Sequence, residues 1–156
     1  TMIQKTKMAI PILIAEDDEE DRMLVEEAME ESLLSNPLYF VHDGEQVMDF
    51  LYNRGGYEDK QKFPLPGLIL LDLNMPKKDG RQVLSEIRQD PKLKKIPIIV
   101  LTTSKAEEDI LRTYDLGVNS YITKPVTFDG LVEIVCNLGK YWFEIVTIPY
   151  NDEIGH

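Results

Sequence analysis

The stretch Gly67-Leu68-Ile69-Leu70-Leu71-Asp72 places four apolar residues in a row and ends on a carboxylate. An unbroken apolar run of this length, bounded by turn-forming residues, is typical of a strand buried on both faces, as in a parallel sheet. Similar runs lie elsewhere in the chain, over Ala9–Ala15, Leu38–Val41, Ile96–Leu101 and Val118–Ile122. The chain is therefore expected to contain five parallel strands.

Amphipathic segments separate or follow these runs. Apolar residues recur at helical spacing within Asp18–Leu34, Asp43–Tyr52, Gly80–Gln89, Lys105–Leu116 and Thr127–Val146. Asp43 is expected to cap the second of these helices, Pro91 to end the third and Gly117 to cap the fourth. A strand–helix unit repeated five times, with right-handed crossovers, predicts an α/β fold with helices on both faces of a doubly wound parallel sheet.

One connection is long for such a domain. Residues 52–66 form a charged, glycine-containing loop of about 15 residues that ends with Pro64 and Pro66, whereas connections in compact domains are usually much shorter. Two interpretations stay open, namely a loop that contributes to specificity and a loop that is mobile.

The length and the net charge of the chain limit the classes of protein to which it can belong. The chain has 156 residues, with 17 Lys and Arg against 28 Asp and Glu, so its formal net charge is −11. A surface of this sign repels phosphate backbones and anionic membranes, so no nucleic acid and no membrane is expected as a partner. Cys136 stands alone, which excludes an internal disulfide and a Cys-based zinc site. No apolar run approaches the roughly 18 residues of a membrane span.

The expected organisation is one cytoplasmic domain at residues 9–146, with an N-terminal arm at residues 1–8 and a C-terminal tail at residues 147–156. No separate output domain is expected, because only about ten residues follow the last helix. An output signal would then pass through protein contacts.

Chemically useful side chains follow four of the expected strands. Glu16, Asp17 and Asp18 follow the first strand, Asp72 ends the third, Thr102 ends the fourth, and Lys124 follows the fifth. In open α/β sheets, ligands bind at this edge. Clustered carboxylates repel one another unless a cation joins them, and oxygen ligands with room for water suit Mg²⁺. Asp72 could offer an oxygen to an incoming phosphoryl group, whose charge the metal and Lys124 would offset. Glu16 is open to two interpretations, a supporting role behind the ligands and simple exposure to solvent.

Four motifs, in this order along the chain, resemble the receiver domain of bacterial two-component response regulators. They are Ile12–Asp18, Leu70–Gly80, Ile98–Ser104 and Tyr121–Pro125. The resemblance covers residues 9–146. It implies a (βα)5 flavodoxin-like receiver fold, with a five-stranded parallel sheet in the order 2-1-3-4-5.

The same resemblance implies a metal site. Asp17 and Asp18 would form its acidic pair, Asp72 would be a further ligand, and Asn74 would give its backbone carbonyl. The implied ion is Mg²⁺, for which Mn²⁺ or Ca²⁺ can substitute.

A phosphoryl site is implied as well. Asp72 would be the phosphoacceptor, Lys124 would bond the phosphoryl group, and the Lys124–Pro125 peptide would be cis. Thr102 and Tyr121 would form a coupled switch, in which Thr102 moves toward the phosphate and Tyr121 rotates inward. The family is not enzymatic in the ordinary sense, since its chemistry is limited to Mg²⁺-dependent self-phosphorylation from phosphodonors and self-dephosphorylation.

The implied partner is a histidine kinase. The 52–66 loop, the Leu101–Ile110 stretch and the aromatic C-terminal region are similar to regulators paired with bacterial and cyanobacterial phytochrome kinases. The rival class is a small phosphohydrolase with an aspartate nucleophile. Such enzymes commonly place a second aspartate two residues after the nucleophile, where this chain has Asn74, and no cap domain is evident in the sequence.

The last helix has an unusually wide apolar face. Its apolar residues span an arc of roughly 200°, about twice a usual core-facing stripe. We expect the excess, including Trp142 and Phe143, to form a homodimer interface with the helix at Lys105–Leu116 and the strand at Val118–Ile122. The alternative is that residues 147–156 or the N-terminal arm cover this face.

Overall fold

The computed structural model describes residues 10–31, 37–102, 105–112, 116–118, 120–123, 129–130 and 133. In chain order the elements are β1 (Ile12–Ala15), α2 (Glu19–Glu31), β2 (Leu38–Val41), α3 (Gly44–Leu51), β3 (Leu68–Asp72), α4 (Gly80–Gln89), β4 (Ile98–Thr102), α5 (Lys105–Arg112) and β5 (Ser120–Thr123). All strand pairs are parallel, and the sheet order is β2-β1-β3-β4-β5. The predicted α/β architecture and strand order are therefore confirmed.

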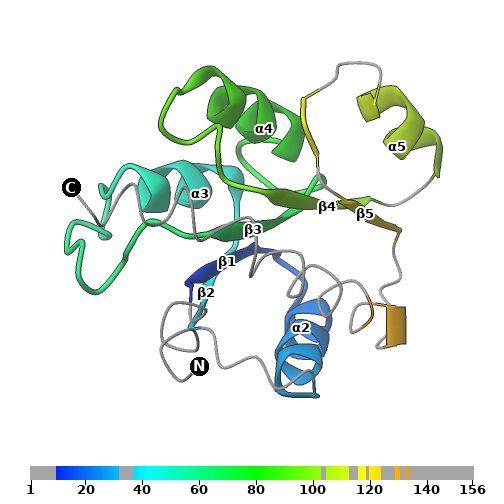
Figure 1. Ribbon diagram of the computed structural model, residues 1–156, viewed down its shortest axis with the longest axis horizontal. Helices are drawn as coiled ribbons and strands as arrows, with labels where there is room; N and C mark the ends of the chain where they lie inside the picture. Colours follow the sequence, from blue (N-terminus) through cyan, green and yellow to red (C-terminus); the bar gives the residue numbers. More distant parts are fainter. Residues whose placement is uncertain are drawn as a thin grey trace, which may run out of the picture.

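Helices cover both faces of this sheet. Figure 1 shows α3, α4 and α5 on one side and α2 on the other. Within the last expected helix, the described residues 129–130 and 133 are helical. The expected boundaries of the arm and the tail lie outside the described residues and stay predictions. No helix among the described residues is long and apolar enough to cross a bilayer.

Burial explains why the strand sequences are continuous apolar runs. Every residue of β1, β3 and β4 is buried, because these strands are central and have helices on both faces. The edge strands β2 and β5 are only partly buried. Asp43 caps α3 as predicted, since its side chain accepts a hydrogen bond from the Gln46 N–H at 2.8 Å. The helix α4 ends at Gln89, just before Pro91, as predicted.

The 52–66 loop is packed against the domain through aromatic side chains. Tyr57 and Phe63 contact the ring of Phe50 in α3, with centroid distances of 5.3 and 5.7 Å, and Phe63 also contacts Tyr39 in β2. Asn53 adopts a left-handed backbone conformation (φ 54°), and its side-chain amide donates to the carbonyls of Tyr57 and Phe63. These contacts favour a fixed loop over the mobile alternative.

One arginine side chain forms hydrogen bonds with the loop before β4 and with the loop before β5. The half-buried guanidinium of Arg88 donates to the carbonyls of Lys94 and Ile96 before β4, and to those of Leu116 and Gly117 before β5. Burial lowers the pKa of Arg88 from its ordinary value. The Arg88 side chain thus links the loop before β4 to the loop before β5.

Candidate functional site

Three carboxylates meet at the edge of the sheet where the strands end. One ligand oxygen from each of Glu16, Asp17 and Asp72 lies within 4.8 Å of the other two. The strand register produces this meeting: Ala15 pairs with Leu71, so the next residues of the two strands, Glu16 and Asp72, are level. Glu16 and Asp72 are fully buried, whereas Asp17 is exposed.

Asp18 has another role. Its carboxylate accepts hydrogen bonds from the backbone N–H groups of Glu20 and Asp21, at 2.8 and 3.2 Å, and so caps α2. The carboxylates that lie beside Asp72 are therefore those of Glu16 and Asp17, whereas the metal-binding role expected of Asp18 stays a prediction. The physical reason is that β1 ends at Ala15, so the first residue past the strand is the one carried into the cluster.

The burial of Glu16 also rules out the interpretation that it is merely solvated. Its Oε2 accepts a hydrogen bond from the Asp18 N–H at 3.0 Å, and its own N–H donates to the carbonyl of Val41. The signal that could have identified it is positional: an acidic residue directly after a buried strand lies deeper than acidic residues further on.

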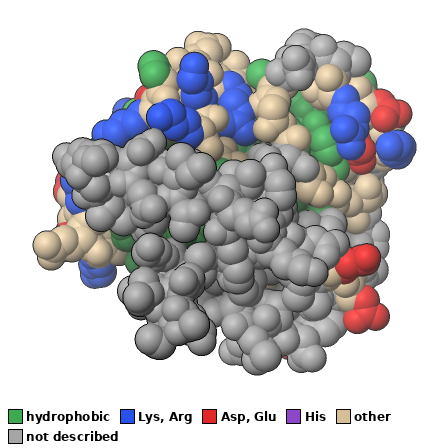
Figure 2. Space-filling model, in the orientation of Figure 1, with side chains coloured by type: hydrophobic (Ala, Val, Ile, Leu, Met, Phe, Trp, Pro, Cys, Tyr) green, Lys and Arg blue, Asp and Glu red, His purple; other side chains and the backbone are tan. Residues whose placement is uncertain are grey.

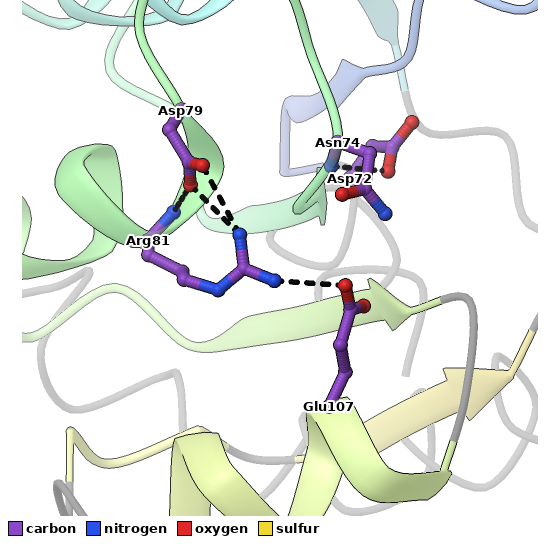
Figure 3. A network of polar contacts seen from close by, with 5 residues as sticks. All are labelled: Asp72, Asn74, Asp79, Arg81 and Glu107. Carbon is purple, nitrogen blue, oxygen red and sulfur yellow. Dashed lines mark hydrogen bonds and ion pairs between the residues drawn. The ribbon is translucent and has the colours of Figure 1, made fainter.

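Asp72 lies against the start of α4. Its Oδ1 accepts a hydrogen bond from the Asn74 N–H at 2.9 Å, as Figure 3 shows. A Cβ atom added at Gly80 would lie 2.5 Å from the Asp72 carbonyl oxygen, so only glycine allows α4 to begin this close to β3. The Gly80 N–H closes the turn by donating to the Leu73 carbonyl at 3.1 Å. The role of the Asn74 carbonyl as a ligand stays a prediction.

Thr102 and Tyr121, the predicted switch residues, lie on the next two strands of the chain, β4 and β5. Thr102 is fully buried at the end of β4, one residue beyond Leu101, which pairs with Asp72. Tyr121 is level with Val100 and partly buried, with the Arg112 guanidinium 4.3 Å from its ring centroid. Burial raises the pKa of Tyr121. Thr102 therefore shares the edge with Asp72, whereas Tyr121 lies one strand further out.

The remaining predicted site and interface residues, Lys124, Pro125, Trp142 and Phe143, lie outside the described residues. Their expected roles stay predictions.

An ion-pair network missed by sequence reasoning lies beside Asp72 (Figure 3). Arg81, near the start of α4, donates through Nη2 to Glu107 of α5 at 2.8 Å and contacts both carboxylate oxygens of Asp79. Asp79 also caps α4 by accepting from the Arg81 N–H at 2.6 Å. The pairing joins residues 26 positions apart, so no local spacing in the sequence indicates it.

The chemistry of the carboxylate cluster is that of a hard-cation site. Carboxylates this close repel one another, and a divalent cation relieves that repulsion. An all-oxygen donor set with one solvent-exposed member, Asp17, suits an ion that keeps water ligands. Asp72 itself is fully buried at the end of β3.

Comparisons with known proteins agree with this geometry. The family model of the response regulator receiver domain matches residues 12–136. Response regulator Rcp1 of Synechocystis sp. (strain ATCC 27184 / PCC 6803 / Kazusa) is 46% identical over 138 residues, or 88% of this chain and 92% of Rcp1.

Two solved structures are similar along nearly their whole length. The Mn²⁺-bound form of Rcp1 has a TM-score of 0.72 and 45% identity, and the match covers 87% of this chain and 96% of that chain. The phosphorylated cyanobacterial phytochrome response regulator RcpA has a TM-score of 0.73 and 44% identity, and the match covers 86% of this chain and 94% of that chain. With its sheet order and its carboxylate-lined strand ends, this chain belongs to the response regulator receiver domain family.

Proposed function

We propose that Asp72 accepts a phosphoryl group from a histidine kinase and that the modified domain signals through changed protein contacts. The observation that supports this proposal best is the buried Asp72 carboxylate, which shares its sheet edge with Glu16, Asp17 and Thr102. Family membership supports the phosphoacceptor role independently.

The proposed reaction is a single displacement at phosphorus. A carboxylate oxygen of Asp72 attacks the phosphorus of a phosphohistidine, an acyl-phosphate P–O bond forms, and the P–N bond to imidazole breaks. The leaving imidazole takes a proton from solvent. Such a transfer depends mainly on positioning and on compensation of charge. The Asn74 N–H already orients Asp72, and we propose that the Thr102 hydroxyl and the Lys124 ammonium bind the phosphoryl oxygens.

We propose a divalent-metal site at the carboxylate cluster. Glu16, Asp17 and Asp72 would hold the ion, with the Asn74 carbonyl as a further ligand. Mg²⁺ is the proposed ion, with Mn²⁺ or Ca²⁺ as substitutes. When bound, the ion would offset negative charge on the phosphoryl group and on the carboxylates. The Mn²⁺-bound structure of Rcp1 supports divalent-metal binding in a close relative.

The proposed kinase partner is of the phytochrome type, because RcpA is named as a phytochrome response regulator. The proposed output is protein contact from the cytoplasm, without nucleic acid or membrane, and includes a homodimer through Trp142, Phe143, α5 and β5. The rival activity, a phosphohydrolase with an aspartate nucleophile, is not favoured. The residue two positions after Asp72 is Asn74, which cannot transfer a proton, and the family match is to a receiver domain.

Incubation with a small phosphodonor such as acetyl phosphate, with and without Mg²⁺, tests the reaction. We expect an alkali-labile mass gain of one phosphoryl group that requires Mg²⁺ and is lost in Asp72→Asn. Asp109→Asn, which changes an exposed carboxylate on α5, is the matched control and should retain the gain. A gain that persists in Asp72→Asn contradicts the proposal, and steady turnover of added phosphoesters would favour the hydrolase.

A further inference from the structure

A cavity of about 440 Å³ lies at the end of the molecule remote from Asp72. It opens between the end of α3, the 52–66 loop and the turn that follows α4, and its lining comprises Leu51, Tyr52, Asn53, Lys60, Leu65, Asp90, Lys92 and Leu93. The loops before β3 and β4 contribute to it, and parallel strands carry their beginnings and ends at opposite edges of a sheet. The cavity is therefore separate from the carboxylate cluster.

The floor of the cavity is apolar, and hydrogen bonds join the segments that form its walls. Leu51 and Leu93 are buried in the core beneath it. The Tyr52 hydroxyl donates to Asp90 Oδ2 at 2.7 Å and so joins α3 to the turn after α4. Asp90 Oδ1 also accepts from the N–H groups of Lys92 and Leu93, at 2.8 and 3.2 Å. The one carboxylate in the lining thus already has three hydrogen-bond donors. The hydrogen bond from Tyr52 lowers its pKa most, and the charge of Lys92 also acts on it to lower its pKa.

Five exposed lysines lie in or beside this cavity. Lys60 and Lys92 belong to the lining. Lys62, Lys94 and Lys95 flank them in the same two loops, and all five lysines are exposed. None of the five takes part in an ion pair with the part of the chain that the structure describes.

Two nearby arginines, by contrast, are already engaged. Arg54 pairs with Asp49 and Arg88 with backbone carbonyls. Figure 2 shows Lys and Arg side chains gathered on the α3 and α4 side of the molecule. In a chain whose formal net charge is −11, this local excess of positive charge is a distinct feature of the surface.

We propose that this basic cavity docks an acidic segment of a partner protein, which inserts one apolar side chain between carboxylates. An apolar side chain would contact Leu51, Leu65 and Leu93, and the flanking carboxylates would meet Lys60 and Lys92. The outer lysines belong to the two loops that line the cavity. Together with Lys60 and Lys92 they offer more positive charges than one small anion would need, which suits several residues of an extended segment. A concave apolar floor suits an inserted side chain better than a flat lipid surface.

The surface lies away from Asp72, so it can be occupied while the carboxylate cluster is engaged by a kinase. Charges at the rim of such a site mainly steer association and select the sign of the partner, whereas the buried side chain supplies most of the affinity. Binding should therefore weaken as salt concentration rises, since exposed charge pairs are screened.

A peptide titration of the full chain tests the proposal. The probe is a fluorescein-labelled peptide with two glutamates on each side of one leucine, followed by fluorescence anisotropy and by amide NMR shifts. We expect shifts centred on Leu51, Tyr52 and Leu93, and binding that weakens at higher salt. Lys60→Gln with Lys92→Gln should weaken binding by about tenfold at low salt, as expected for two lost surface charge pairs.

Matched controls separate the contributions. Lys105→Gln removes one lysine charge from α5 and should bind the peptide as the unaltered chain does. Peptides with serine in place of leucine, or lysines in place of glutamates, should bind weakly. The proposal is overturned if millimolar peptide causes no shifts, if the Lys60 and Lys92 double variant binds equally well, or if the serine peptide binds equally well. Lysine-dependent binding to vesicles of phosphatidylserine and phosphatidylcholine, without peptide binding, would assign the surface to a membrane instead.

Discussion

Arg81 and Glu107 join the start of α4 to α5 through a hydrogen-bonded ion pair, with 2.8 Å between Nη2 and Oε2. The start of α4 lies directly against the end of β3. The Gly80 N–H donates a hydrogen bond to the Leu73 carbonyl, and the backbone of Asp72 and Leu73 lies too close to Gly80 for a side chain at that position. The helix α5 follows β4, which ends at Thr102. The pair therefore connects the helix that follows Asp72 to the helix that follows Thr102.

We expect Arg81→Ala to raise the rate of phosphorylation by acetyl phosphate by about threefold. The reason is that a partly exposed pair contributes less than about 1 kcal/mol, and its loss would ease the proposed movement of Thr102 toward the phosphoryl group. The cap of α4 survives, because Asp79 accepts from the backbone N–H of residue 81.

Glu107→Gln should have a similar effect, and the double variant should add little to either change. Arg54→Ala breaks a pair of equal length, 2.8 Å between Arg54 and Asp49, away from the site, and should leave the rate unchanged. Equal rates in the unaltered chain and in both single variants would show that the pair does not restrain Thr102.

The metal site gives a direct comparison of two neighbouring carboxylates. Glu16→Gln should weaken Mg²⁺ binding by at least about tenfold, because it removes a charged member of the cluster around Asp72. Asp18→Asn should bind Mg²⁺ nearly as well as the unaltered chain, since asparagine is an equally good helix cap and Asp18 caps α2. Isothermal titration calorimetry measures both. A larger loss in Asp18→Asn would restore the pairing of Asp17 with Asp18.

The difference between Glu16 and Asp18 shows where sequence reasoning reached its limit. The unbroken apolar runs predicted the sheet, and they also predicted that Asp17 follows one buried strand and that Asp72 and Thr102 end two others. Which acidic residue after β1 turns into the cluster depends on where the strand ends and the helix begins, and boundaries shift by one or two residues in any pattern.

Contacts between segments that are distant in the chain also could not be predicted from the sequence. The aromatic contacts of Tyr57 and Phe63 that pack the 52–66 loop need the tertiary approach of β2 and α3. The same holds for Arg88, whose four carbonyl partners come from two separate loops. Periodicity describes which face of an element is apolar, but it does not describe which polar groups meet across elements.

Arg88 should be a major contributor to stability. Arg88→Met keeps much of the apolar stem but removes the donors to the carbonyls of Lys94, Ile96, Leu116 and Gly117. We expect a loss of about 2–3 kcal/mol in the free energy of unfolding, since four hydrogen bonds from a half-buried charged donor are lost. Urea unfolding measures the change, and Arg54→Met, at a more exposed ion pair, should cost less than about 1 kcal/mol. Equal losses in the two variants would contradict the assigned role.

Glu108 should make the stability of the domain depend on pH at the acidic end. Its buried carboxylate accepts from Nε and Nη2 of Arg112, at 2.9 and 2.6 Å, and from Lys105 at 3.3 Å. The hydrogen bonds from Arg112, followed by the one from Lys105, lower the pKa of Glu108 from its ordinary value of 4.5, although burial opposes them.

A carboxylate whose pKa is lower in the folded state than in the unfolded chain stabilises the fold above the unfolded pKa. That contribution is lost as pH falls through the folded pKa, because the folded protein must then take up the proton. Glu108→Gln should therefore lower the melting temperature at pH 7, and the difference from the unaltered chain should shrink as pH falls below about 4.5. Asp109→Asn, next along α5 but 61% exposed and 3.7 Å from Lys105, should show no comparable pH-dependent difference. A Glu108→Gln deficit that stays constant from pH 7 to pH 3 would mean that packing, and not the charge of residue 108, stabilises this corner of α5.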